Sequence, residues 1–275
     1  MREEFPKAAR AELRDLLWLF RCLWAQAHPR EKHVLHWQRV GAVWAMDFAR
    51  ARHLVDKRYP YVFTVRDLAS GMQLAWRPVR QETSAIVQSE LELLFTVYGA
   101  PLVLKSDNGS AFRAEEVKRF LGRWEVWSLY SPPGVPGYNG AIERSIGALK
   151  RETELEAYRR GHAGEWTGED LEAARALVNA SRRPGNRGGA SPEAVWEGRR
   201  PPSRSEREAF GRAVQEAEEV DRGQGGLEPR EYQDHYEQAA LYRRVLTQVL
   251  VECGLLTITR RRIPQKFFGQ KVANI

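Results

Sequence analysis

The chain has 275 residues, with 43 lysines and arginines against 36 aspartates and glutamates and a hydrophobic content of 43%. That composition is ordinary for a protein with a packed core and excludes a disordered chain, while the formal net charge of +7 favours a polyanionic partner such as a nucleic acid. Only two cysteines are present and no apolar run approaches the roughly 20 residues of a membrane span, so we expect no disulfide framework, no membrane segment and a reducing, cytoplasmic compartment.

The N-terminal part, residues 1–40, is predicted to be a helical lead-in. Apolar residues recur at helical spacing between residues 5 and 27, and a His-Pro pair at positions 28 and 29 ends the pattern. The apolar positions are Leu13, Leu16, Leu17, Phe20 and Leu23. We expect this helix to pack against the rest of the protein.

Residues 41–51 alternate as a β-strand does. Trp44, Met46 and Phe48 point to one face, whereas Asp47 points to the other among small residues. A carboxylate in the middle of an apolar strand is costly to bury unless a partner satisfies it. A bound cation would be such a partner.

The next elements alternate between strand and helix. Residues 61–79 predict two strands around a Ser-Gly turn, with Asp67 at the end of the first of them. Further along, we expect a helix over residues 83–98, a strand over 100–107, a helix over 114–124 and a strand over 126–131. This order indicates an α/β sheet with covering helices. Asp67 is the main rival of Asp47 as a functional acid, and we interpret it as a turn residue.

The stretch LVLKSDNGSAF, residues 102–112, runs from a buried-looking strand directly into Ser-Asp-Asn-Gly. Asp107 has an ordinary explanation, because Asp and Asn favour turns by bonding their own backbone and Gly supplies positive φ. A chemical role for Asp107 therefore depends on other acids nearby.

A third acid, Glu143, lies in the stretch PGYNGAIERSIGALKRE, residues 136–152, where a Pro/Gly-rich loop opens into an amphipathic helix. The stripe predicted to pack consists of Ile142, Ile146, Leu149 and Thr153. Lys150 follows Glu143 by nearly two turns of about 3.6 residues and projects on the same side. The alternative is an ordinary solvated helix edge.

These three acidic segments together resemble the catalytic core shared by retroviral integrases and the DDE transposases, within the ribonuclease-H-like enzymes. The family has 35 residues between its second and third acids, and here 143 minus 107 is 36, so 35 residues intervene. Asn139 precedes a small residue before the Glu, and Leu-Lys-Arg-Glu at residues 149–152 matches a family motif. The predicted core spans residues 41–200, and ASPEAVWEGRRP at residues 190–201 resembles the tail of bacterial transposase cores.

The resemblance implies a ribonuclease-H-like mixed sheet flanked by helices and a DNA transposase or integrase that nicks DNA ends and transfers strands. Asp47, Asp107 and Glu143 would be catalytic and would hold two Mg²⁺ ions, which Mn²⁺ can replace, with Asp47 bridging both. The DNA contacts expected within the core are Lys105, Asn139 and Lys150, of which Lys105 rests only on its closeness to Asp107. We also expect a homo-oligomer assembled on DNA and a separate end-recognition or accessory protein.

The C-terminal part, residues 201–275, predicts two helices, over residues 205–220 and 229–253, followed by a short strand, a basic turn and a second extended piece. This order suits a winged-helix-like module whose wing touches phosphates. The contacts would be made by Arg260, Arg261, Arg262 and Lys266. The alternative is a helical appendage that packs or dimerises.

A second function stays open beside strand transfer. Family transposases carry helix-turn-helix domains upstream of the core, whereas this chain begins about forty residues before Asp47. The protein would then be a domesticated or truncated DNA-binding protein that keeps the fold without moving an element. The presence of all three acids favours an active enzyme.

Overall fold

The computed structural model describes residues 10–28, 30–132, 140–181, 189–225 and 235–263. The chain forms two compact units, one of Met1–His36 with Thr257–Ile275 and one of Trp37–Leu256. The predicted division into residues 1–40, 41–200 and 201–275 concerns separate functional domains and stays a prediction. Among the described residues, no helix is long and apolar enough to cross a membrane.

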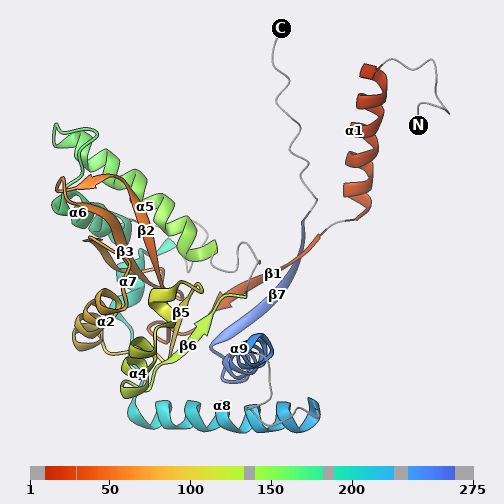
Figure 1. Cartoon of the computed structure of the whole chain (residues 1–275), viewed down its shortest axis with the longest axis vertical. Helices are drawn as coiled ribbons and strands as arrows, with labels where there is room; N and C mark the ends of the chain where they lie inside the picture. Colours follow the sequence, from red (N-terminus) through yellow and green to blue (C-terminus); the bar gives the residue numbers. More distant parts are fainter. Residues whose placement is uncertain (1–9, 29, 133–139, 182–188, 226–234, 264–275) are drawn as a thin grey trace. The chain divides into compact units, whose positions relative to one another are not determined.

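A five-stranded mixed sheet forms the centre of the larger unit, in the order β4-β3-β2-β5-β6 (Figure 1). The strands are β2 (Val43–Val55), β3 (Tyr59–Asp67), β4 (Gln73–Val79), β5 (Val103–Ser106) and β6 (Trp127–Tyr130). The first three are antiparallel, whereas β5 pairs in parallel with both β2 and β6. The predicted ribonuclease-H-like α/β arrangement is confirmed.

Helices cover both faces of this sheet. One face carries α2 (Ser84–Tyr98), α3 (Ser110–Arg113) and α4 (Glu115–Arg123), and the other carries α5 (Gly140–Arg159) and α6 (Gly168–Ala180). The alternation of β2 explains the two layers, because Trp44 and Met46 enter the α2 side of the core and Ala49 enters the α5 side. Thr83 caps α2, and its side chain accepts a hydrogen bond from Ile86 N.

Asp67 is a turn residue, as predicted. Its carboxylate is fully buried and accepts hydrogen bonds from Gly41 N at 2.9 Å and from both Ser70 N and Ser70 Oγ at 2.6 Å. The buried carboxylate of Asp67 thus stabilises the turn between β3 and β4.

The segment at residues 190–201 contains a short helix that the sequence did not indicate, α7 (Pro192–Glu197). Its Trp196 is buried against Trp44 and Tyr98. The Arg199 guanidinium lies 3.8 Å above the Trp196 ring, so this member of a basic cluster packs within the fold. The tail motif of the core therefore has a structural role.

Two long helices follow, α8 (Arg204–Gly225) and α9 (His235–Glu252), and they pack against each other within the larger unit. Arg207 fixes the start of α8 by donating to Pro101 O at 2.8 Å. The structure thus contains the two predicted C-terminal helices. It does not contain the expected basic hairpin in the residues described after them.

The strand β7 (Leu256–Ile263) pairs instead with β1 (Arg30–Trp37), from the other end of the chain. His36 Nε2 and Thr259 Oγ1 lie 2.9 Å apart across this pair. The prediction of a basic turn at residues 260–262 was wrong, because these arginines lie within β7. The strand β1 was not predicted at all.

The N-terminal helix α1 (Arg10–Ala27) confirms the predicted periodicity but not the expected packing. Six large apolar side chains of α1 are between 44% and 65% exposed in this single chain. They are Leu16, Trp18, Leu19, Phe20, Leu23 and Trp24.

Candidate active site

Asp47 and Asp107 lie level with each other on neighbouring strands. The parallel register pairs Ala45 of β2 with Lys105 of β5. Asp47 and Asp107 each follow these residues by two positions, so they lie beside each other, and Asp107 is the first residue after β5. Adjacent strands are about 4.8 Å apart. Both carboxylates therefore emerge on the α5 face of the sheet, where the sequence alone could not place them together.

Asp107 also forms the turn that its sequence suggests. One carboxylate oxygen accepts a hydrogen bond from Gly109 N at 2.9 Å, and the Asn108 side chain donates to Ser131 O at 2.6 Å. Ser131 Oγ in turn donates to Ser106 O at 3.0 Å. The turn thus anchors the carboxylate and leaves its second oxygen available for another ligand.

Gly109 has a φ of −53°, so it does not supply the expected positive φ, and a side chain at this position would be crowded. A Cβ at this position would lie 3.0 Å from Asp107 Oδ1 and 3.3 Å from the Phe112 ring. We expect Gly109→Ala to displace the Asp107 carboxylate and lower activity more than about tenfold. Assays of strand joining beside a thermal melt check this, with Gly122→Ala as the control because its Cβ would meet nothing within 4 Å. Equal loss of stability and activity in both variants would contradict it.

Glu143 reaches the same face from the first turn of α5, and it is exposed. The predicted stripe anchors this helix, since Ile142, Leu149 and Thr153 are buried and Ile146 is partly buried. A contact that the sequence did not suggest fixes the helix start, because Arg66 Nη1 of β3 donates to Ala141 O at 2.9 Å.

The electrostatics of Asp47 show that these acids interact. Burial, first of all, and then the negative charge of Asp107 raise the pKa of Asp47 to about 7, with smaller contributions from Glu143 and Glu82. Among the described residues, Lys150 is the cation whose pKa responds to the charge of Asp47, and it does not offset the effect of burial and of the neighbouring acids. A hard divalent cation fits this set of oxygen donors, although among the described residues no three acidic, His or Cys side chains are already gathered closely enough to hold one.

The predicted lysines have different positions. Lys150 is half-buried on the same side as Asp47. Burial and the charge of Arg52 lower the pKa of Lys150, and the charge of Asp47 offsets part of this shift. Lys105 is only 3% exposed, and burial lowers its pKa to about 7. The burial of Lys105 does not favour a contact with a phosphate at the surface, and the expected DNA contact stays a prediction.

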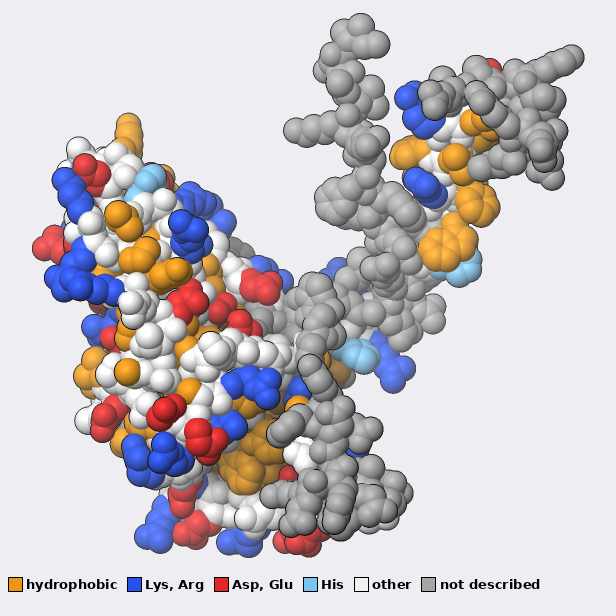
Figure 2. Space-filling view, in the orientation of Figure 1, with side chains coloured by type: hydrophobic (Ala, Val, Ile, Leu, Met, Phe, Trp, Pro, Cys, Tyr) orange, Lys and Arg blue, Asp and Glu red, His pale blue; other side chains and the backbone are white. Residues whose placement is uncertain are grey.

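The structure does not test the remaining predicted DNA contacts. Asn139 and Lys266 lie outside the described residues, and the side chain of Arg262 is likewise not described. Arg260 and Arg261 are exposed on β7, in the smaller unit. On the face shown in Figure 2, Lys and Arg side chains alternate with Asp and Glu side chains over the larger unit, so the net charge is not gathered in one patch there.

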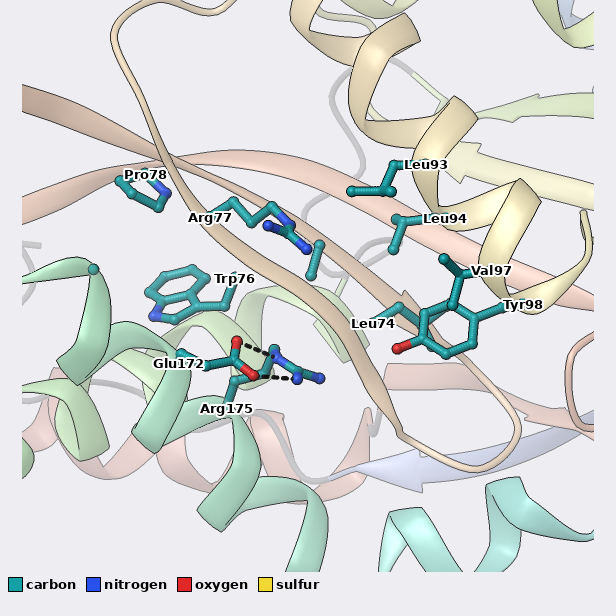
Figure 3. Close-up of a pocket in the computed structure, with 12 residues that line it drawn as sticks. Leu74, Trp76, Arg77, Pro78, Leu93, Leu94, Val97, Tyr98, Glu172 and Arg175 are labelled. Carbon is teal, nitrogen blue, oxygen red and sulfur yellow. Dashed lines mark hydrogen bonds and ion pairs between the residues drawn. The ribbon is translucent and has the colours of Figure 1, made fainter.

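A hollow of about 340 Å³ lies away from these acids, between β4, α2 and α6 (Figure 3). Arg175 points into it, paired with Glu172 and donating to Gln73 O at 2.9 Å. Its apolar lining includes Leu93 and Val97. Because its charged groups already pair with each other, we place no catalytic chemistry there.

Comparison with known proteins supports the arrangement of the core. Residues 38–136 match the family model of the integrase core domain. The chain is 34% identical over 173 residues to the Gag-Pol polyprotein of baboon endogenous virus and 33% identical over 174 residues to the Pol polyprotein of feline endogenous virus ECE1. Each match covers 60% of this chain, but only 9% and 15% of the respective polyprotein.

A solved retroviral integrase assembly has a similar fold, and a second solved structure matches over most of its own length. The simian T-cell lymphotropic virus intasome in complex with the PP2A regulatory subunit B56 gamma is 18% identical with a TM-score of 0.53, covering 64% of this chain and 63% of that chain. The HTLV-2 integrase catalytic core in complex with magnesium is 19% identical with a TM-score of 0.47, covering 57% and 97%. Residues 38–136 thus match the integrase core domain model, and the fold of the chain is similar to that of a retroviral integrase structure. The family match ends before Glu143, whose place in the site rests on α5.

Proposed function

We propose that this protein catalyses metal-dependent nicking of DNA ends and strand transfer, in transposition or integration, with Asp47, Asp107 and Glu143 as the metal ligands. The observation that carries the proposal is the level placement of Asp47 and Asp107 on two parallel strands, with α5 bringing Glu143 to the same face. The raised pKa of Asp47 supports it, because burial and the neighbouring acids disfavour the charged carboxylate, which a bound cation would stabilise.

The reaction divides into two displacements at phosphorus. Water attacks a phosphodiester at the DNA end, and the departing 3′ oxygen becomes a free hydroxyl. That hydroxyl then attacks a phosphodiester of the target, which releases a new 3′ hydroxyl there. No covalent intermediate with the protein is required.

The chain contributes orientation and negative charge to these steps. Two divalent ions, Mg²⁺ or Mn²⁺, would activate the attacking oxygen and stabilise the leaving one. Asp47, whose pKa both Asp107 and Glu143 raise, would hold the metal together with these two acids. Lys150 is placed to contact a phosphate beside them, because it is partly accessible on the same side. The proposed partners are DNA, further copies of the chain assembled on DNA, and a separate end-recognition or accessory protein.

The test is a joining assay with the full chain. The substrates are pre-cut DNA ends with a free 3′ hydroxyl, pooled over candidate end sequences, with any co-encoded partner added. We expect joined or nicked products in Mg²⁺ and in Mn²⁺ and none in chelator. If the protein binds DNA but is inert in every condition, the domesticated DNA-binding protein becomes the better description.

A separate prediction concerns the basic C-terminal residues. Replacing Arg260, Arg261, Arg262 and Lys266 with Ala should weaken binding to all DNA sequences alike, because phosphate contacts carry no sequence information. Each lost contact should reduce the slope of log affinity against log salt by about 0.9. Binding titrations at several salt concentrations check this, with Arg204→Ala, an arginine paired with Glu208, as the control. An unchanged slope would remove these residues from the DNA interface.

A further inference from the structure

Arg66 occupies a place in the sheet that connects two of the three acids. It stands in β3 directly opposite Ala45, which precedes Asp47 by two residues in β2. Residues two apart on a strand share a face, and directly opposed residues of an antiparallel pair do so as well. Arg66 therefore lies on the face that carries Asp47, one row away from it.

From this row Arg66 reaches the helix of the third acid. Its Nη1 donates to Ala141 O at 2.9 Å, and Ala141 precedes Glu143 by two residues in the first turn of α5. A guanidinium is always charged, and a hydrogen bond that it donates to a carbonyl is directional. One side chain thus links the strand region of Asp47 to the turn of Glu143.

Stabilisation of the helix alone does not explain this contact. The N-terminal end of a helix carries a partial positive charge, so a cation beside it is unfavourable and an acid is preferred there. The contact therefore costs helix stability to some degree. What it provides is a fixed position for the first turn.

Few other described groups beside the first turn of α5 can fix its position. Ile142 is buried and holds the turn against the sheet, but apolar burial is not directional and sets depth better than rotation. On the other side lies an open hollow of about 510 Å³, lined among others by Arg66, Ala141, Arg144 and Ser145. The described residues on that side therefore leave open space beside the first turn of α5.

We propose that Arg66 is a positioning residue of the active site, which holds the first turn of α5 so that Glu143 faces Asp47 and Asp107. This inference rests on the proposed function, in which Glu143 is a metal ligand. It assigns Arg66 no contact with substrate. It also accounts for an arginine on the same face of the sheet as the acids, one strand away from Asp47.

The experiment compares Arg66→Gln, which shortens the side chain and removes its charge, with Arg66→Lys, which keeps a cationic donor. Three properties are measured on the full chain: Mn²⁺ binding by electron paramagnetic resonance without DNA, amide exchange of residues 141–148 in chelator, and strand joining against metal concentration. Arg144→Gln is the matched control, since Arg144 is an exposed arginine beside the same hollow. Glu143→Gln supplies the reference for a lost ligand.

For Arg66→Gln we expect a Mn²⁺ half-saturation raised about 10- to 100-fold, faster exchange in the first turn of α5, and joining that recovers in part at high Mn²⁺. Arg66→Lys should lie between Arg66→Gln and the wild type, and Arg144→Gln should bind Mn²⁺ as the wild type does. If Glu143→Gln weakens Mn²⁺ binding while both Arg66 variants match the wild type in binding and exchange, the inference is overturned and the proposed function stands. If the wild type binds no Mn²⁺ and joins no DNA, both are wrong.

Discussion

Asp47→Asn, Asp107→Asn and Glu143→Gln should each abolish Mg²⁺-dependent nicking and joining, with a loss of about a thousandfold or more. Each substitution keeps the size of the side chain and removes one charge from a shared site, so the fold should persist. Double and triple variants should be no worse than single ones, because residues that act as a unit are strongly non-additive. Joining assays on all seven combinations measure this directly.

The choice of control matters for this experiment. Asp67→Asn is a poor one, because the Asp67 carboxylate is buried and accepts hydrogen bonds from Gly41 and Ser70, so its loss would disturb the fold. Glu116→Gln, an exposed acid in the first turn of α4, tests the same chemical change without that problem. If Asp107→Asn joins DNA as well as the wild type, Asp107 is a turn residue only.

The metal-free protein should be least stable near pH 7. Asp47 has a folded-state pKa of about 7, above the ordinary 3.8, so the folded state retains a proton that the unfolded state loses, and stability falls as the pH rises from about 4 to about 7. The Lys105 pKa is lowered to about 7 from 10.5, so the unfolded state binds the extra proton above pH 7 and stability recovers as the pH rises further. At about 1.4 kcal/mol per pH unit, the Asp47 effect is at most about 4 kcal/mol.

Urea unfolding in chelator between pH 4 and pH 9 measures this minimum. Asp47→Asn should remove the fall on the acid side and be more stable than the wild type at pH 7, and Lys105→Met should remove the rise on the alkaline side. Mg²⁺ should stabilise the wild type at pH 7 and leave Asp47→Asn almost unaffected, because a ligand that binds the folded state adds stability only where its site exists. A flat profile for the wild type would show that neither group is perturbed as described.

Local patterns in the sequence were sufficient to predict which side chains of β2 and α5 enter the core. The alternation around Asp47 and the helical stripe behind Glu143 determine which face each side chain takes, and both were confirmed. The joint placement of Asp47 and Asp107 depends on the parallel register of β2 with β5, which bridges sixty residues and leaves no local periodicity. The family resemblance supplied that link.

Other features could not be predicted from periodicity, because they too depend on contacts between residues that are distant in the sequence. The pairing of β1 with β7 joins residues more than two hundred positions apart, and charged residues in both strands conceal their β character. Lys105 was expected to contact DNA because its burial depends on which strands flank it, and that pairing is not visible in the local sequence. The contact of Arg199 with the Trp196 ring likewise depends on the folded structure, because the sequence does not show which ring an arginine packs on.

The pairing of β1 with β7 makes the two ends of the chain dependent on each other during expression and storage. A fragment that ends before residue 256 leaves β1 as an unpaired edge strand, and one that begins after residue 37 does the same to β7. Bare edges of this kind promote association between molecules through new strand pairing. A protease cut that releases only β1 or only β7 should therefore increase aggregation of the protein, whereas removing both strands together should not.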